Sequence, residues 1–112
     1  MHPRHRGTQA EELIKQRYIE RGRTCLAHHF AIVGWEIDLI MQNKTFIAFV
    51  EVKDVLHIDD VMGYITNKKR RCIRKTMDTY LWKYAPKRIP RIDVAFTRGK
   101  EVFRVIENCE DF

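Results

Sequence analysis

The sequence predicts an α/β fold. Apolar residues recur at helical spacing in two segments, around residues 8–21 and 66–84, and form short strand-like runs in five other places. These segments follow one another as helix, three strands, helix and two strands. The chain has 112 residues, which is enough to bury one core of two or three layers. We therefore expect residues 1–112 to form a single domain.

The first helix is expected to run from Thr8 to about Arg21. Its apolar side chains lie at helical spacing, at Ala10, Leu13, Ile14 and Tyr18. Thr8 and Glu11 have the spacing of a capping box, in which each side chain accepts a hydrogen bond from the backbone N–H of the other residue. Gly22 is a suitable residue to end the helix.

Three strands are expected after the first helix. Residues 24–32 look extended, although their pattern is weak. The runs EIDLIMQ (36–42) and TFIAFVEVK (45–53) are rich in β-branched and aromatic residues. Only a short polar turn near Asn43 and Lys44 separates these two runs, so we expect them to pair as a hairpin.

The second helix is expected to begin after the N-cap Thr66 and to run to about Tyr84. Its buried stripe is predicted to consist of Ile65, Cys72, Ile73, Thr76, Met77, Tyr80, Leu81 and Tyr84. Pro86 and Pro90 mark the exit from the helix. Two further strands, RIDVAFT and EVFRVIE, flank a turn at Arg98-Gly99-Lys100. Residues 54–64 fit no pattern and are expected to form a loop or a short helix.

The charge of the chain favours a polyanionic partner. It has 21 Lys and Arg against 15 Asp and Glu, a net charge of +6 and a pI near 9.4, which suits nucleic acid if the basic groups cluster on one surface. No apolar run approaches the roughly 20 residues of a membrane span. The basic start MHPRHRG is not followed by the apolar stretch of an export signal. We expect a cytoplasmic protein without a membrane partner.

Charged residues gather at one end of the predicted hairpin. The second strand is apolar over residues 46–50 and then carries Glu51 and Lys53. In this hairpin, the residue numbers of two paired positions add up to an odd number. Asp38 and Glu51 meet this condition, so their side chains face the same side of the sheet. Lys53 shares that side because strand side chains alternate with a period of two. Val52 points to the other face, and we expect its backbone carbonyl to turn toward the cluster.

Two interpretations of this cluster follow from the residue types. Two carboxylates and a carbonyl oxygen suit a hard divalent ion such as Mg²⁺, which fills its remaining positions with water and substrate phosphate. A lysine beside the ion can orient or deprotonate the attacking water, or stabilise the phosphate as charge builds. Phosphodiester hydrolysis uses this combination. The alternative is an ion-pair cluster in which Lys53 neutralises Asp38 and Glu51.

The order of several motifs resembles a known family. The segments GWEIDLI, FVEVK, ITNKKRRCIRKTMDTYL, PRIDVAFT and a closing IEN…F follow one another as in the YraN-type family of the restriction-endonuclease-like PD-(D/E)XK superfamily. The resemblance covers roughly residues 7–112. It implies an α-β-β-β-α-β core with a mixed sheet flanked by helices. It also implies that Asp38, Glu51 and Lys53 are catalytic, with Mg²⁺ or Mn²⁺ bound by Asp38, Glu51 and the Val52 carbonyl.

Two further positions match residues of that family. Glu11 corresponds to a helix glutamate that in related nucleases can add a metal ligand through a water, and its competing role is the capping box. Lys69 corresponds to a family lysine and lies on the same side of the second helix as Ile65 and Cys72, so it is pressed toward the protein. It either contacts a substrate phosphate near the site or snorkels to solvent.

The other basic residues of the second helix predict a nucleic-acid-binding surface. We name Lys68, Arg71, Arg74 and Lys75 the basic row, and expect it to face outward together with Arg70. No acidic residue interrupts residues 68–75. Phosphate contacts of this kind position a nucleic acid without reading its sequence.

His28 and His29 are interpreted as core or surface histidines. They are adjacent in the sequence, so in a regular strand they point to opposite faces. The two rings cannot then bind one ion together.

These observations predict a nucleic-acid-binding protein that hydrolyses phosphodiesters with Mg²⁺ or Mn²⁺. One alternative is a nuclease-fold module that binds nucleic acid with weak or no turnover. Another is a basic protein-interaction domain. The choice between DNA and RNA, the form of the substrate and the oligomeric state, including a homodimer, stay open.

Overall fold

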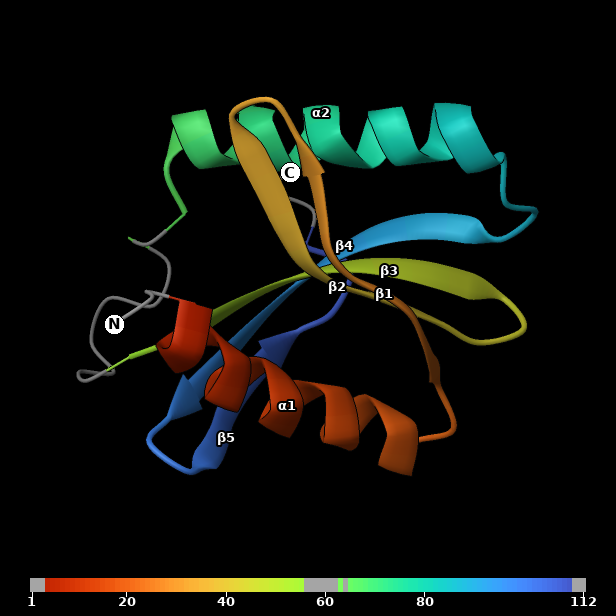
Figure 1. Ribbon diagram of the computed structural model, residues 1–112. Helices are drawn as coiled ribbons and strands as arrows, with labels where there is room; N and C mark the ends of the chain where they lie inside the picture. Colours follow the sequence, from red (N-terminus) through yellow and green to blue (C-terminus); the bar gives the residue numbers. More distant parts are fainter. Residues whose placement is uncertain (1–3, 56–62, 64, 110–112) are drawn as a thin grey trace.

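The computed structural model describes residues 4–55, 63 and 65–109. Its elements, in chain order, are α1 (Arg4–Glu20), β1 (Thr24–Ile32), β2 (Trp35–Gln42), β3 (Phe46–Asp54), α2 (Asn67–Tyr84), β4 (Ile89–Arg98) and β5 (Glu101–Ile106), shown in Figure 1. The predicted order of helices and strands is confirmed. Residues 56–62 and 64, for which a loop or short helix was expected, lie outside the described residues, and Asp54 is the last residue of β3.

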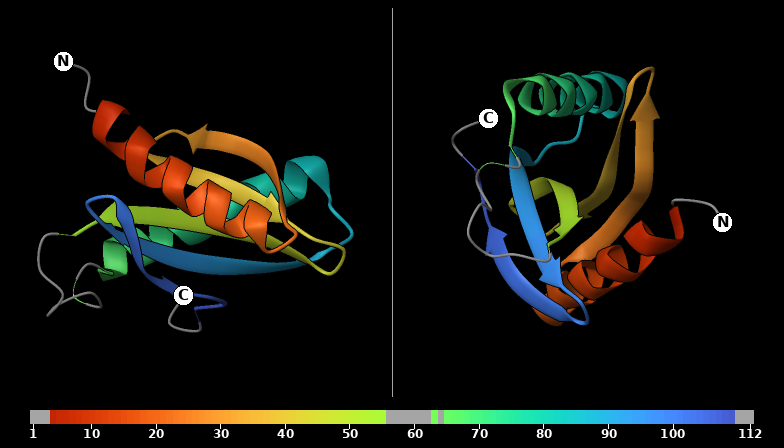
Figure 2. Two further views of the ribbon diagram at one scale, coloured as in Figure 1. Left: turned by 90° about the horizontal axis from the view of Figure 1, so that it is seen from below. Right: turned by 90° about the vertical axis from the view of Figure 1, so that its left-hand side faces the viewer.

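The five strands form one mixed sheet in the order β1-β2-β3-β4-β5. Only β3 and β4 pair in parallel, and the other neighbours are antiparallel. A parallel pair needs a long crossover connection, and α2 lies within that connection. The two helices cover opposite faces of the sheet (Figures 1 and 2). The predicted α-β-β-β-α-β core with a mixed sheet flanked by helices is therefore confirmed.

The core has one layer on each side of the sheet because strand side chains alternate between the two faces. On the α2 side the buried cluster includes Ile40, Ile47, Phe49, Ile73, Met77 and Tyr80. On the α1 side it includes Ile14, Tyr18, Leu39, Met41, Ala48 and Val50. Strand β3 is covered on both faces, which explains its continuous apolar run.

The register of the β2–β3 hairpin agrees with the sequence prediction. Leu39 lies opposite Val50, and Ile40 lies opposite Phe49, so paired positions add up to an odd number. The paired stretch stops at Leu39 and Val50, one residue before Asp38 and Glu51. The candidate site therefore lies where the β2–β3 ladder ends.

The start of α1 differs from the sequence prediction. The helix begins at Arg4 rather than after Thr8, so Thr8 lies inside the helix and the capping-box interpretation is wrong. Residues 4–7 contain one glycine and no proline, and a single glycine in a helix costs only about 1 kcal/mol relative to alanine. A helix can therefore continue upstream of a motif that resembles its start.

The second helix agrees closely with its prediction. Thr66 is the N-cap, and its side chain accepts a hydrogen bond from the Lys69 backbone N–H at 3.2 Å. Most of the predicted stripe is buried, but Tyr84 is 53% exposed, because it lies in the last turn of the helix. Its ring packs against Tyr80, with the ring centres 4.5 Å apart. Among the residues that the structure describes, neither helix is long and apolar enough to cross a membrane.

Candidate functional site

Asp38 occupies the point where β2 and β3 stop pairing. Its Oδ2 atom accepts a 2.7 Å hydrogen bond from the backbone N–H of Val52. The N–H and C=O of one strand residue point to the same side of the strand. A regular strand would therefore direct the Val52 carbonyl toward β2 as well.

Glu51 is the most buried of the predicted site residues on the strands. It is 5% exposed, and its pKa is raised well above the usual value, first by burial and then by the hydrogen bond and negative charge of Asp38. Trp35 and Lys69 oppose that rise in part. Within the described residues, neither Glu51 Oε2 nor Trp35 Nε1 has a hydrogen-bond partner of normal geometry. A buried carboxylate oxygen left in this state favours a cation or a proton.

Two lysines lie near Glu51: Lys53 is two residues further along β3, and the charge of Lys69 acts on Glu51. Lys53 is exposed at the end of β3, and Lys69 is half-buried at the start of α2. Burial first and then repulsion from Lys53 lower the pKa of Lys69, while the charge of Glu51 raises it. Lys69 is thus close enough to feel both Lys53 and Glu51. Its position agrees with the phosphate-contact interpretation, although a snorkelling lysine would also be half-buried.

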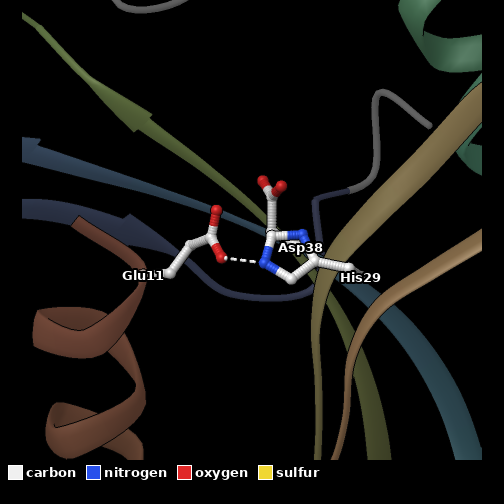
Figure 3. A group of neighbouring side chains, drawn as sticks. All are labelled: Glu11, His29 and Asp38. Carbon is white, nitrogen blue, oxygen red and sulfur yellow. Dashed lines mark ion pairs between the residues drawn. The ribbon is translucent and has the colours of Figure 1, made fainter. Parts of the chain in front are cut away.

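Glu11 reaches the site from α1. It is buried, and its Oε1 atom lies 2.8 Å from Nε2 of His29 (Figure 3). Burial, and after it the negative charge of Asp38, raise the pKa of Glu11 to about 7. One turn further along α1, Ile14 packs into the core, and this contact fixes the depth at which Glu11 lies. With the capping box excluded, the described contacts of Glu11 are those within the site.

His29 lies between two carboxylates. Its Nε2 atom faces Glu11, and its Nδ1 atom is 2.5 Å from Oε1 of Glu36. Burial by itself would lower the pKa of His29, but the hydrogen bond to Glu36 and the charges of Glu11, Glu36 and Asp38 outweigh it, so the pKa is raised.

His29 was not predicted as a site residue, because regular alternation along a strand was expected at this position. His29 has a φ of +52°, a left-handed conformation in which histidine is enriched among non-glycine residues. The pairs His28 with Leu39 and Phe30 with Ile37 flank this position, so His29 lies level with Asp38. No pattern in the sequence signals the irregular backbone.

The predicted nucleic-acid-binding residues lie on α2. All four residues of the basic row are exposed, while Lys69 and Arg70 are half-buried. A shallow hollow on this side of the helix is lined by Arg71, Arg74, Lys75, Asp78, Thr79 and Trp82. The four residues of the basic row therefore face outward, as predicted, but Arg70, which was expected to face outward with them, is half-buried and its Nε atom is buried. The exposed Trp82 lies beside the row.

The residues at the site fit a divalent metal ion. Glu11, His29 and Asp38 each place one potential ligand atom within 4.8 Å of the other two (Figure 3). Glu51, which holds the buried oxygen described above, interacts with Asp38 but is not a member of this group. Carboxylates and imidazole bind divalent ions in proteins. Without a cation, two neighbouring carboxylates repel each other, and one of them tends to hold a proton.

The protein has the PD-(D/E)XK nuclease fold. This class is defined by a mixed sheet between two helices, with an aspartate on one hairpin strand and Glu-x-Lys on the next. The chain belongs to the YraN-type family within it: the model of the uncharacterised protein family UPF0102 matches residues 10–96, well over half of the chain. The resemblance found in the sequence is therefore confirmed.

Relatives support this membership, and each is described only as a UPF0102 protein. A protein of Methylobacterium nodulans is 35% identical over 79 residues, which cover 70% of this chain and 61% of that protein. A protein of Halorhodospira halophila is 31% identical over 102 residues, covering 89% and 83%. A protein of Saccharophagus degradans is 49% identical over 47 residues, covering 42% and 40%. The chain thus spans less than two thirds of the first and third of these relatives.

Proposed function

We propose that this protein binds nucleic acid along α2 and hydrolyses phosphodiester bonds at Asp38, Glu51 and Lys53 with Mg²⁺ or Mn²⁺. One observation supports this function above the others. Glu51 holds a buried carboxylate oxygen without a normal hydrogen bond beside Asp38, and Lys69 is close enough to interact with the charge of Glu51. A purely structural ion-pair cluster would be expected to satisfy such an oxygen.

Each residue has a distinct task in this proposal. Asp38, Glu51 and the Val52 carbonyl hold the ion, and Glu11 assists from α1. The ion, when bound, supplies Lewis acidity toward the phosphate and its attacking water. Lys53 orients that water or neutralises charge that develops on the phosphate oxygens. Water adds to phosphorus, one P–O ester bond breaks, and the departing oxygen takes up a proton.

The basic row gives the protein a way to hold its substrate. Its four exposed cations can neutralise phosphates along a strand, and Lys69, on the same helix, is close enough to interact with Glu51. Contacts to phosphate carry no base information. We therefore expect binding that depends on the form of the nucleic acid more than on its sequence.

Cleavage assays test the proposed function directly. Duplex, single-stranded and branched DNA and RNA are incubated with Mn²⁺ and either the wild type or Lys53→Ala. We expect the wild type to cut at least one substrate and Lys53→Ala to cut it at least about a hundredfold more slowly. Lys100→Ala, an exposed lysine on the β4–β5 turn, is the matched control and should cut at the wild-type rate.

Other outcomes would select the alternatives. Equal cutting by Lys53→Ala and the wild type would contradict the proposed role of Lys53. Tight binding without cleavage of any substrate would favour a module that lost turnover. Binding to an acidic protein at low salt, without binding to nucleic acid, would favour the protein-interaction domain.

A further inference from the structure

His29 has the surroundings of a metal-binding histidine. Histidines that bind metals usually donate the second ring N–H to a carboxylate, which fixes the tautomer and the orientation of the ring. Here Nδ1 is hydrogen-bonded to Glu36 at 2.5 Å. The opposite nitrogen, Nε2, is directed at Glu11 and lies in one group with Asp38. Glu36 therefore holds the ring so that its remaining nitrogen faces the carboxylates of the site.

The spacing of these atoms suits one ion. Ligand atoms about 2.1 Å from a six-coordinate ion lie about 3 Å apart when they are neighbours around it. Nε2 of His29 and Oε1 of Glu11 are 2.8 Å apart. The Asp38 carboxylate completes a set within 4.8 Å. These three side chains come from α1, β1 and β2, so the tertiary fold brings them together.

A second observation, independent of the histidine, also indicates a cation. Glu51 is 5% exposed, and it lies close enough to Asp38 for the two carboxyl groups to interact. Within the described residues its Oε2 atom has no hydrogen-bond partner of normal geometry, although the Trp35 side chain comes close enough to oppose the rise of the Glu51 pKa. A buried carboxylate oxygen beside a second carboxyl group is stabilised by a nearby cation or by a proton.

We propose that His29, together with Glu11 and Asp38, binds a divalent first-row transition ion such as Mn²⁺. An imidazole ligand favours transition ions, whereas Mg²⁺ prefers an all-oxygen set. The site therefore selects Mn²⁺ over Mg²⁺. This assignment rests on the proposed function, because Asp38 is a metal ligand in both. It specifies which divalent ion is the cofactor. Glu36 is a positioning residue that acts through His29.

Pulsed electron paramagnetic resonance on Mn²⁺-loaded protein tests this assignment without any substrate. A directly bound imidazole nitrogen modulates the Mn²⁺ echo, and incorporation of ¹⁵N-histidine shifts the modulation frequencies. We expect the wild type to show the nitrogen signal and His29→Asn to lose it. His28→Asn, the exposed neighbour, is the matched control and should keep it.

Calorimetric titration gives the selectivity. His29→Asn should lower Mn²⁺ affinity at least about tenfold, while Mg²⁺ affinity changes less than about threefold. His28→Asn should change neither. Should His29→Asn fail to fold, the labelled wild type by itself still decides whether a histidine nitrogen binds the ion.

Each result separates this assignment from the proposed function. If Mn²⁺ binds without nitrogen modulation, His29 only bridges Glu11 and Glu36. That result would overturn its role as a metal ligand, even if the protein cleaves nucleic acid. A clear nitrogen signal without cleavage of any substrate would support the ligand and count against the nuclease. Absence of Mn²⁺ binding would overturn the metal site itself.

Discussion

The backbone N–H of Val52 donates to Oδ2 of Asp38 at 2.7 Å, just beyond the last paired residues of β2 and β3. This bond holds the Asp38 carboxylate in place in the absence of an ion. It does not neutralise the carboxylate, which still repels Glu51. Without a cation, the candidate site is therefore ordered but electrostatically unfavourable.

Mn²⁺ should raise the melting temperature of the wild type but not of Asp38→Asn. An ion that binds only the folded state stabilises it by about 2.7 kcal/mol at one hundred times its Kd. Asparagine keeps an oxygen that can accept from Val52 and removes a negative charge. Asp38→Asn should therefore melt no lower than the wild type in chelator. Thermal melts of both proteins, with chelator and with Mn²⁺, measure the effect.

The ion-pair alternative predicts the opposite pattern in the same melts. If Asp38 serves to neutralise Lys53, its loss leaves a positive charge without its partner. Asp38→Asn would then melt lower in chelator, and the wild type would not respond to Mn²⁺. That result would remove the basis for a nuclease site.

Glu11 should make the metal-free protein less stable as the pH rises. Its pKa of about 7 in the folded protein lies above the ordinary 4.5, so folding favours the protonated form. The contribution of the protonated Glu11 to stability is complete below its ordinary pKa of 4.5. It is lost as the pH rises through the folded-state pKa of about 7. We expect the melting temperature of Glu11→Gln, relative to the wild type in chelator, to increase across that window.

The same carboxyl group should make metal binding depend on pH. A ligand must lose its proton before it binds an ion, so wild-type Mn²⁺ affinity should rise with pH through about 7. Glu11→Gln should bind Mn²⁺ more weakly and with a flatter pH dependence. Unchanged affinity in calorimetric titrations would refute Glu11 as a ligand.

Replacing part of the basic row should weaken binding to all nucleic-acid sequences alike. For Arg71→Ala/Arg74→Ala, the slope of log affinity against log salt should shrink by about one to two units. Arg98→Ala/Lys100→Ala removes the same charge from the exposed β4–β5 turn and should leave the slope almost unchanged. Fluorescence anisotropy over a range of salt concentrations measures both. Equal slopes in all three proteins would mean that the row is only a solvated surface.

Tyr18→Phe should destabilise the fold without affecting the metal site. The Tyr18 hydroxyl donates to Oδ2 of Asp93 at 2.5 Å, and Asp93 is fully buried. Removing a hydrogen bond to a buried charged group costs about 2 kcal/mol. Denaturant unfolding should show this loss, whereas the Mn²⁺-induced rise in melting temperature should persist. Tyr84→Phe, on an exposed tyrosine, should unfold like the wild type.

The elements and the hairpin register were predictable because they depend on local patterns. The period of the apolar residues located β2, β3, α2, β4 and β5 to within a few residues, and the short turn at Asn43 determined which residues of β2 and β3 face each other. The grouping of Asp38 with Glu51 followed from that register. The start of α1 was predicted wrongly at Thr8, because the residues of a capping motif are also compatible with a helix interior.

The sequence by itself determined the order of helices and strands, the buried faces and the end of the hairpin at which the charges gather. Only the tertiary structure decided that α1 brings Glu11 to Asp38 and that His29 joins them. Local patterns encode periodicity, because side-chain burial repeats with the helix or strand. The packing of α1 on the sheet and the left-handed backbone of His29 depend on contacts between distant segments, which leave no periodic signal in the sequence.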